Sequence, residues 1–384
     1  MTVKLKNKIG LICRNIKSDR KSPFLSMCLY IKRTIQKREF KQRGNIIMRK
    51  EATLEQWKEL YETATRIKEM KPWDYLWDMD IIAIQNGAEE DTVFCSILGR
   101  GGTCYGIAVY EGYEAFNTYM MMAMQQKLNL PVDYVMYKQK NLTCYWGDRE
   151  ELSDKQRKTI KDLGYKYRGK NQWLYFMSYE PNYFPYNMNQ AEVLRMTEHL
   201  NSLELALKYY VEKDVTVKFD EGNMFLLKFV ENKKTWSFGE EPLPFTSFQY
   251  GNLLITDEEL LEELKDAGKN DTILEMDISY LGTAVSDKKY DRPANPALCM
   301  IAEAKTGMIL KCEIQEPEVD AMISLAEELI GFILQCGAPK EVRVSNIIVE
   351  AGLEQICETC RIKLRRVKRL TGLEEFKAGM MRFR

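Results

Sequence analysis

Short runs of apolar residues, separated by polar turn residues, dominate the C-terminal part of the chain. Lys305-Thr306-Gly307 should join two of these runs as a hairpin, because glycine adopts a positive φ without steric cost. The pattern predicts five strands, at residues 272–280, 297–304, 308–314, 341–344 and 362–367.

Two helices are predicted between the last three strands. Apolar residues fall at helical spacing after Pro317, which suits the first position of a helix, and Gly337 and Pro339 should end that helix. Asn346 should cap the second helix, whose apolar stripe runs to Cys360. We expect a mixed sheet with the strand 272–280 at its centre and the first helix over one face.

The preceding part of the chain mixes helical and strand patterns. A helix should begin at Ala52 or Thr53, and Gly99 to Gly102 joins two strands as a hairpin rather than as a phosphate-binding loop, which would have to open a helix. The helix at 113–127 is rich in Met, and we expect these Met residues to fill a core. The other elements predicted there are strands at 79–84, 92–98 and 104–110 and a helix at 189–210.

Seven aromatic residues lie between Trp173 and Tyr186, and Pro181 and Pro185 should keep this segment from being one regular element. The favoured interpretation is an aromatic loop packed on the following helix. The alternative is a stacking platform for single-stranded nucleic acid beside a basic groove. The candidate binding residues are Arg168, Lys170, Trp173, Tyr179 and Tyr183.

The chain has 384 residues and a mass of 45.0 kDa, for which two domains are the natural expectation. Strands at 215–219, 224–229 and 235–238 should connect the domains, Pro242 and Pro244 mark a boundary, and a helix at 256–267 follows. The predicted division is a basic leader at 1–47, an N-terminal α+β domain at 48–210, connecting strands at 211–250 and a C-terminal domain at 251–384.

The first 47 residues hold 13 Lys or Arg against Asp19 and Glu39, a net charge of +11. The whole chain has a net charge of 0, so residues 48–384 carry −11. A basic arm for nucleic acid or an anionic membrane is one interpretation. The favoured one is that Met48 is the native start and that the leader is non-native or disordered.

Ten scattered Cys residues, most of them in apolar patterns, indicate reduced thiols and a cytoplasmic location. The longest apolar helical stretch, Met322 to Cys336, is interrupted by Glu327 and Glu328 and is shorter than the roughly 20 residues that a membrane span needs. We therefore expect no membrane partner.

The order of strands and helices over residues 271–370 resembles the ribonuclease-H-like superfamily of nucleases, transposases and ATP-binding relatives. The resemblance implies that acids in the first strand, after the fourth strand and on a helix hold divalent metal ions. Asp277 matches the first acid, but Ser345-Asn346 follows the fourth strand without a carboxylate. The acids on the predicted helix are Asp320, Glu327 and Glu328, and the last two lie on its solvated side. We interpret Asp277 as a structural or vestigial acid.

From about Met48 the chain also resembles a bacterial family of uncharacterised two-domain proteins. The resemblance is carried by Trp57 to Tyr61, Lys71-Pro72-Trp73, Ser96 to Gly99, Tyr105 to Tyr110, Leu163 to Tyr165 and Tyr167 to Trp173. Where the family pattern has arginine-serine and Pro-Gly-Tyr, this chain has Phe176-Met177-Ser178 and Pro181-Asn182-Tyr183. The resemblance implies no activity.

Other chemical signals are weak. His199 stands in a polar helical stretch with no nucleophile pattern around it, and Cys357 and Cys360 belong to an apolar helical stripe, with no second pair to complete a zinc site. The basic run from Arg361 to Arg369 favours an edge strand protected by charge, with a phosphate-binding edge as the alternative.

The sequence predicts an α+β protein of two domains, of which the C-terminal one is a ribonuclease-H-like mixed sheet with helices. The leading hypothesis is a non-catalytic binding or interaction protein with a protein or nucleic-acid partner and no cofactor. The first alternative is a Mg²⁺-dependent nuclease or phosphotransfer enzyme centred on Asp277. The second is a nucleic-acid-binding protein without catalysis.

Overall fold

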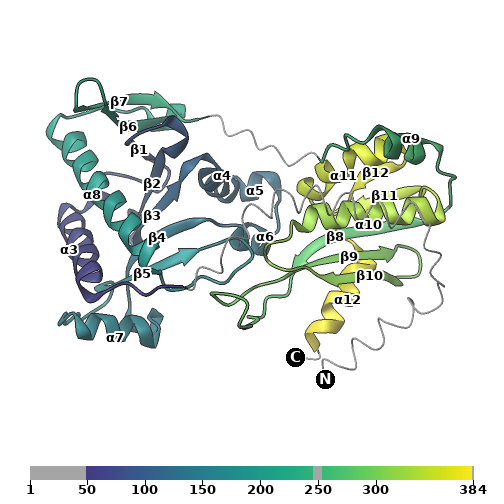
Figure 1. Cartoon of the computed structure of the whole chain (residues 1–384), viewed down its shortest axis with the longest axis horizontal. Helices are drawn as coiled ribbons and strands as arrows, with labels where there is room; N and C mark the ends of the chain where they lie inside the picture. The colour runs from purple at the N-terminus through teal and green to yellow at the C-terminus, as the bar shows by residue number, and fades with distance from the viewer. Residues whose placement is uncertain (1–48, 245–252, 383–384) are drawn as a thin grey trace. The chain divides into compact units, whose positions relative to one another are not determined.

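A computed structural model describes residues 49–244 and 253–382 of the chain, so the predicted basic leader at 1–47 lies outside the described residues. From Lys50 on, the described residues form a mixture of helices and sheets (Figure 1). The strands of these described residues make one seven-stranded and one five-stranded sheet. The α+β class is therefore confirmed.

The seven-stranded sheet has the order β5-β4-β3-β2-β1-β6-β7. Neighbouring strands are antiparallel except for β1 and β6, which are parallel. The strands are β1 (Ile82–Gln85), β2 (Val93–Leu98), β3 (Tyr105–Glu111), β4 (Asn141–Gly147), β5 (Trp173–Tyr179), β6 (Asn223–Val230) and β7 (Thr235–Pro242).

Alternating side chains give this sheet two apolar faces. Ile82 and Ile84 belong to the core beneath α3 and α8, whereas Ala83 belongs to a second core beneath α4. The helices α3 and α8 contact each other along one face of the sheet (Figure 1). The helices of this part are α3 (Leu54–Met70), α4 (Gly112–Ala123), α5 (Gln125–Leu128), α6 (Val132–Tyr137), α7 (Asp154–Asp162) and α8 (Gln190–Glu212).

Local sequence signals explain where these helices begin. Thr53, Ser153 and Asn189 each cap the helix that follows by accepting a bond from the third helical residue, whose side chain bonds back to the capping residue. This reciprocal bonding satisfies amide groups that have no partner within the helix.

Three predictions for this part need correction. The segment predicted as one aromatic loop contains β5, because period-two burial fits its first seven residues as a strand. Of the four Met residues expected in a core, Met120 and Met121 pack against apolar clusters, Met124 is half-buried and Met122 is exposed, since α4 buries Ala115, Phe116 and Tyr119 most deeply. Residues 211–250, predicted as connecting strands, contribute β6 and β7 to the sheet itself, and 215–219 is not a strand.

The five-stranded sheet has the order β10-β9-β8-β11-β12. Strand β8 is central; it is antiparallel to β9 and parallel to β11, which in turn is parallel to β12. The predicted mixed sheet and its ribonuclease-H-like strand order are confirmed. The strands are β8 (Ile273–Tyr280), β9 (Ala297–Glu303), β10 (Ile309–Ile314), β11 (Glu341–Val344) and β12 (Lys363–Arg366).

Helices cover both faces of this sheet (Figure 1). Helices α10 and α11 contact β8 on one face, and α12 packs through Leu370 and Leu373 on Leu298 and Met300 on the other. Asp320 rather than Pro317 opens α10, while the predicted end at Gly337 and the predicted cap Asn346 are confirmed. The helices are α9 (Glu258–Asp266), α10 (Ala321–Cys336), α11 (Ile347–Thr359) and α12 (Thr371–Arg382).

Among the described residues, none of the helices is both long and apolar enough to cross a membrane.

Candidate functional site

Asp277 lies in the middle of the central strand β8 and is only 6% exposed. Because side chains alternate along a strand, its carboxylate faces α12 together with Glu275, while Met276 and Ile278 face α10 and α11. The position expected for the first catalytic acid is therefore a buried position under the last helix.

Three polar groups surround the Asp277 carboxylate. Lys377 Nζ of α12 lies 2.6 Å from Oδ2, and Ser345 Oγ donates a bond of 3.1 Å to Oδ1. Asn346 Nδ2 donates a longer bond of 3.4 Å to Oδ1. Ser345 and Asn346 lie here because β11 pairs in parallel with β8 and Arg343 stands beside Glu275, so the residues that follow β11 come alongside Asp277.

Asn346 has a structural role as well. Its Oδ1 accepts bonds from the amides of Ile348 and Val349, which caps α11. The amide therefore caps a helix and donates to Asp277 at the place where the resemblance implies a second carboxylate.

Glu275 is a second buried acid on this face, and the sequence analysis missed it. It is 2% exposed, and its Oε2 accepts a bond of 3.1 Å from the amide of Leu373 in the first turn of α12. A carboxylate at a helix N-terminus is stabilised by the unpaired amides and the helix dipole. The two-residue spacing of Glu275 and Asp277 was the signal that could have revealed it.

The acids predicted on the helix do not join Asp277. Asp320 accepts a bond from the amide of Met322 and caps α10, and Glu328 pairs with Lys311 at 2.8 Å. In the ranges 49–244 and 253–382, no group of three or more His, Cys, Asp or Glu residues is placed to hold a metal ion. Because a pair of Mg²⁺ ions needs several carboxylate oxygens, the donors around Asp277 do not fit such a pair.

The five predicted binding residues are not gathered at one place. Arg168 and Lys170 are exposed before β5, and Trp173 begins that strand, with the Arg149 guanidinium 6.0 Å from its ring. Tyr179 ends the same strand, roughly 20 Å farther along at the usual strand rise.

The two tyrosines of this set are engaged within the protein. The hydroxyl of Tyr179 lies 2.9 Å from that of Tyr145, and Tyr183 donates its hydroxyl to Glu318. Burial and the bond to Glu318 raise the pKa of Tyr183. These contacts give both rings a structural role.

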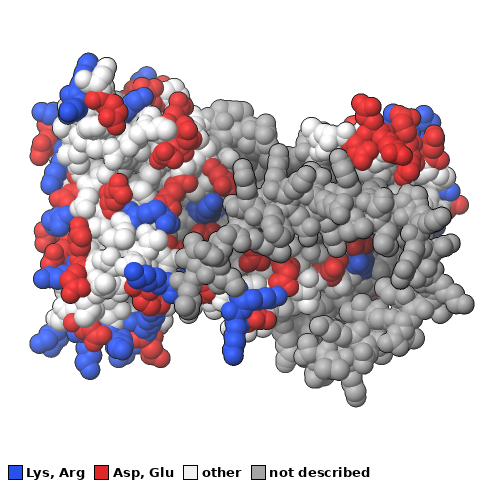
Figure 2. Space-filling model, viewed as in Figure 1, with Lys and Arg blue, Asp and Glu red and all other residues white. Residues whose placement is uncertain are grey.

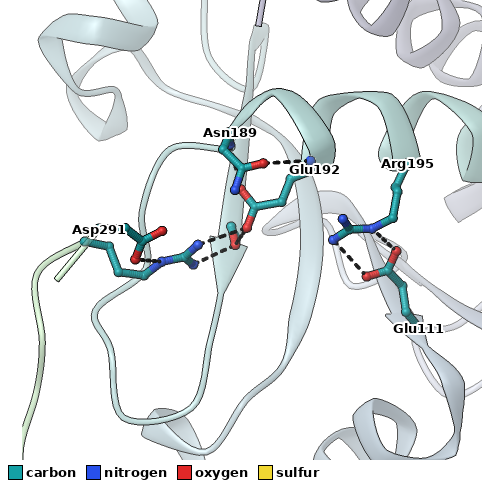
Figure 3. Close-up of polar contacts among 7 residues, drawn as sticks. Glu111, Asn189, Glu192, Arg195 and Asp291 are labelled. Atoms are coloured by element: carbon teal, nitrogen blue, oxygen red, sulfur yellow. Dashed lines mark hydrogen bonds and ion pairs between the residues drawn. The ribbon is translucent and has the colours of Figure 1, made fainter. Parts of the chain in front are cut away.

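A buried ion pair lies near the end of β5. Arg292 Nη2 lies 3.0 Å from Glu192 Oε1, and both side chains are only 5% exposed. Ser178 Oγ of β5 donates to Glu192 and accepts from Arg292. Figure 3 shows Glu192 in the first turn of α8 beside its capping residue Asn189. This pair joins the loop that contains Arg292 to β5 and α8.

A second charged group lies one turn farther along α8. Arg195 Nε and His199 Nε2 contact Glu111 Oε1 at 2.7 and 2.8 Å, and Figure 3 shows the Arg195 contacts. Burial opposes ionisation of Glu111, but the bonds from His199 and Arg195 and their charges lower its pKa to about 2. His199 is thus a half-buried residue that contacts an acid, and no nucleophile accompanies it among these contacts.

The fold and these contacts define an α+β protein whose five-stranded sheet has the ribonuclease-H-like strand order and whose first-strand acid is paired with a lysine. Residues 57–227 match the model of a domain of unknown function (DUF7309), and residues 260–381 match that of another domain of unknown function (DUF6930). A search of curated proteins finds no match.

Two solved structures show a distant similarity. The integrase catalytic core domain of HTLV-2 in complex with magnesium is 17% identical, with a TM-score of 0.22 over 30% of this chain and 68% of that one. The simian T-cell lymphotropic virus intasome in complex with PP2A regulatory subunit B56 gamma is 16% identical, with a TM-score of 0.23 over 30% of this chain and 40% of that one. Similarity this low says nothing of the activity of this chain.

Proposed function

We propose that this chain is a non-catalytic binding protein whose second domain uses the ribonuclease-H-like sheet as a scaffold. The observation that carries the proposal is the contact of 2.6 Å between Lys377 Nζ and Asp277 Oδ2. An ammonium group at this distance neutralises the carboxylate that a metal ion would otherwise need.

The neighbouring groups support the same conclusion. Glu275 is bound by the amide of Leu373, and Asn346 offers a neutral amide and is committed to capping α11. Metal-assisted phosphoryl transfer needs carboxylates that clamp the ions and offset their charge. On this proposal the chain needs no cofactor, and its partner is a protein or a nucleic acid rather than a membrane.

A cytoplasmic location is part of the proposal. Eight cysteines in the described ranges are free, and burial raises the pKa of several of them, such as Cys95 and Cys144. Free buried thiols of this kind suit a reducing compartment.

Glu275 favours one alternative, a metal-dependent nuclease or phosphotransfer enzyme. It places a second carboxylate on the same face of β8 as Asp277, so displacement of α12 would expose two acids together. Binding of nucleic acid without catalysis has less support, because the coloured part of the face in Figure 2 intersperses acidic and basic side chains and gathers acids over α9.

A cleavage assay separates these functions. We expect the full chain to leave single- and double-stranded DNA and RNA intact in Mg²⁺ or Mn²⁺, and Asp277→Asn to alter thermal stability without altering that result. The matched control is Asp287→Asn, an exposed acid in a loop. Metal-dependent cleavage that disappears in Asp277→Asn but persists in Asp287→Asn would replace the binding role with the enzymatic one.

A further inference from the structure

Strand β12 forms one edge of the five-stranded sheet, and its exposed side chains are basic. Lys363, Arg365 and Arg366 are exposed in a strand of four residues. Register places Lys363 beside Glu341 and Arg365 beside Arg343 of β11, so these four side chains share one face of the sheet.

On β11 and β12 this face holds more positive than negative charge, while Glu275 of β8, which lies beside Arg343 by register, accepts a bond from the amide of Leu373. Glu341 contacts Arg343 at 2.7 Å and Lys363 at 3.3 Å, so one carboxylate serves two cations. In the described part of the chain, no carboxylate lies within ion-pair distance of Arg365. Arg365 is therefore opposite a like charge, an arrangement that costs stability in a sheet.

Protection of an edge strand against aggregation explains only part of this pattern. Charged side chains on a short edge strand oppose unwanted pairing. Protection does not account for Arg343, which lies on the inner neighbour β11 and directly opposite Arg365. An anionic group that binds between the two guanidinium groups would remove the repulsion, because each guanidinium offers a planar set of donors to a carboxylate.

The backbone of β12 also offers a place for a partner. The amide of Lys363 donates to Lys340 O and that of Val367 donates to Val344 O, so alternate residues of β12 bond toward β11. The amide and carbonyl groups of Leu364 and Arg366 consequently point to the outer edge. An extended peptide can pair with such groups as an added strand.

We propose that the β11–β12 edge binds an acidic, extended segment of a partner protein, which adds as a strand beside β12 and directs a carboxylate over Arg365 toward Arg343. The inference rests on the proposed binding function and names its partner class. A peptide fits better than a nucleic acid, because residues 361–369 contain no aromatic side chain for base stacking.

The test uses the full chain and labelled probe peptides in fluorescence anisotropy. We expect saturable binding of a peptide of alternating Glu and Val and no binding of its Lys and Val counterpart. Proline at alternate positions of the acidic peptide should weaken binding, because proline lacks the amide that the edge requires. Raising the salt concentration should weaken it too.

Variants then locate the site. Arg365→Gln and Arg343→Gln should each weaken binding of the Glu-Val peptide about tenfold, since each removes a charge-assisted hydrogen bond. The matched control is Arg369→Gln: its side chain is 78% exposed, pairs with Glu374 and lies beyond β12, so affinity should remain within about twofold. Melting curves of all three variants verify that they fold.

Three results would overturn the inference: failure of the Glu-Val peptide to bind, equal effects of Arg365→Gln and Arg369→Gln, or preferential binding of a thymidine oligonucleotide that Arg365→Gln abolishes. Metal-dependent cleavage in the assay above would instead overturn the proposed function and leave the peptide result to be judged by itself.

Discussion

At the scale of single residues, the Asp277 carboxylate is buried, and its chemistry depends on which group neutralises its negative charge. Its side chain is 8% exposed and that of Lys377 is 27% exposed. A buried charge without a partner costs several kcal/mol, so such groups pair or lose their charge. Lys377 thus supplies the positive charge that the buried Asp277 carboxylate requires.

Replacement of Lys377 by Met should therefore destabilise the protein. We expect Lys377→Met to lower the free energy of unfolding by about 2–3 kcal/mol, because it leaves Asp277 with two neutral donors. Asp277→Asn in the same chain should restore much of the loss, and urea unfolding of the single and double variants measures this coupling. Lys170→Met, at an exposed position, is the control, and an equal loss in that variant would contradict the role of Lys377.

Glu111 makes acid stability depend on one identifiable group. Its folded-state pKa of about 2 lies below the ordinary value of 4.5, because the bonds from His199 and Arg195 outweigh burial. The Glu111 carboxylate therefore binds a proton more tightly in the unfolded chain than in the folded one. Its contribution to folding stability is fully present above pH 4.5 and disappears as the pH falls toward 2. Glu111→Gln should flatten the decline of unfolding free energy over that interval, as followed by urea titrations at successive pH values. If the decline of unfolding free energy were unchanged in Glu111→Gln, other carboxylates would be responsible for the loss of stability in acid.

At the scale of elements, the sequence predicts the strands of the five-stranded sheet but does not predict helix α12. Strands β8 to β12 were predictable, because apolar runs and turn residues set them locally. Helix α12 was missed, since Gly372, Lys377 and Gly379 dilute its apolar pattern. Lys377 and Asp277 lie 100 positions apart, and no local pattern carries information on such a contact. The fold was therefore accessible from the sequence, and the partner of Asp277 was not.

Gly372 allows α12 to begin close to the sheet. A Cβ atom at this position would lie 3.1 Å from the Cα atom of Gly307 and 3.3 Å from Glu275 Oε2. Gly372→Ala should therefore cost about 1–3 kcal/mol of unfolding free energy. Gly379→Ala is the matched control in the same helix, because its Cβ would meet no atom within 4 Å, and alanine should stabilise the helix by about 0.5–1 kcal/mol. Effects of the same sign in chemical denaturation would show that α12 does not approach the sheet this closely.

At the scale of the whole molecule, a few buried polar contacts join segments that lie far apart in the sequence. Asn182 is 7% exposed, donates to Pro317 O at 2.6 Å and accepts from the hydroxyl of Tyr280 at 3.0 Å. Arg292 contacts Glu192 and Ser178 in the same way. The sequence analysis missed this group, because a buried arginine in a loop looks like any exposed one until its partner is known.

The Arg292 contacts should make the elements around both sheets unfold together. Arg292→Met removes the guanidinium that contacts the buried Glu192 carboxylate, so we expect a loss of about 3–5 kcal/mol and a single calorimetric transition that broadens or divides into two. Arg66→Met is the control, because Arg66 pairs with Glu204 at 2.9 Å but its own side chain is 47% exposed. That variant should change stability by less than about 1 kcal/mol and keep one transition. If Arg292→Met also kept one transition with unchanged enthalpy, the cooperativity would have to come from apolar packing alone, and the buried ion pair would only fix the position of its loop.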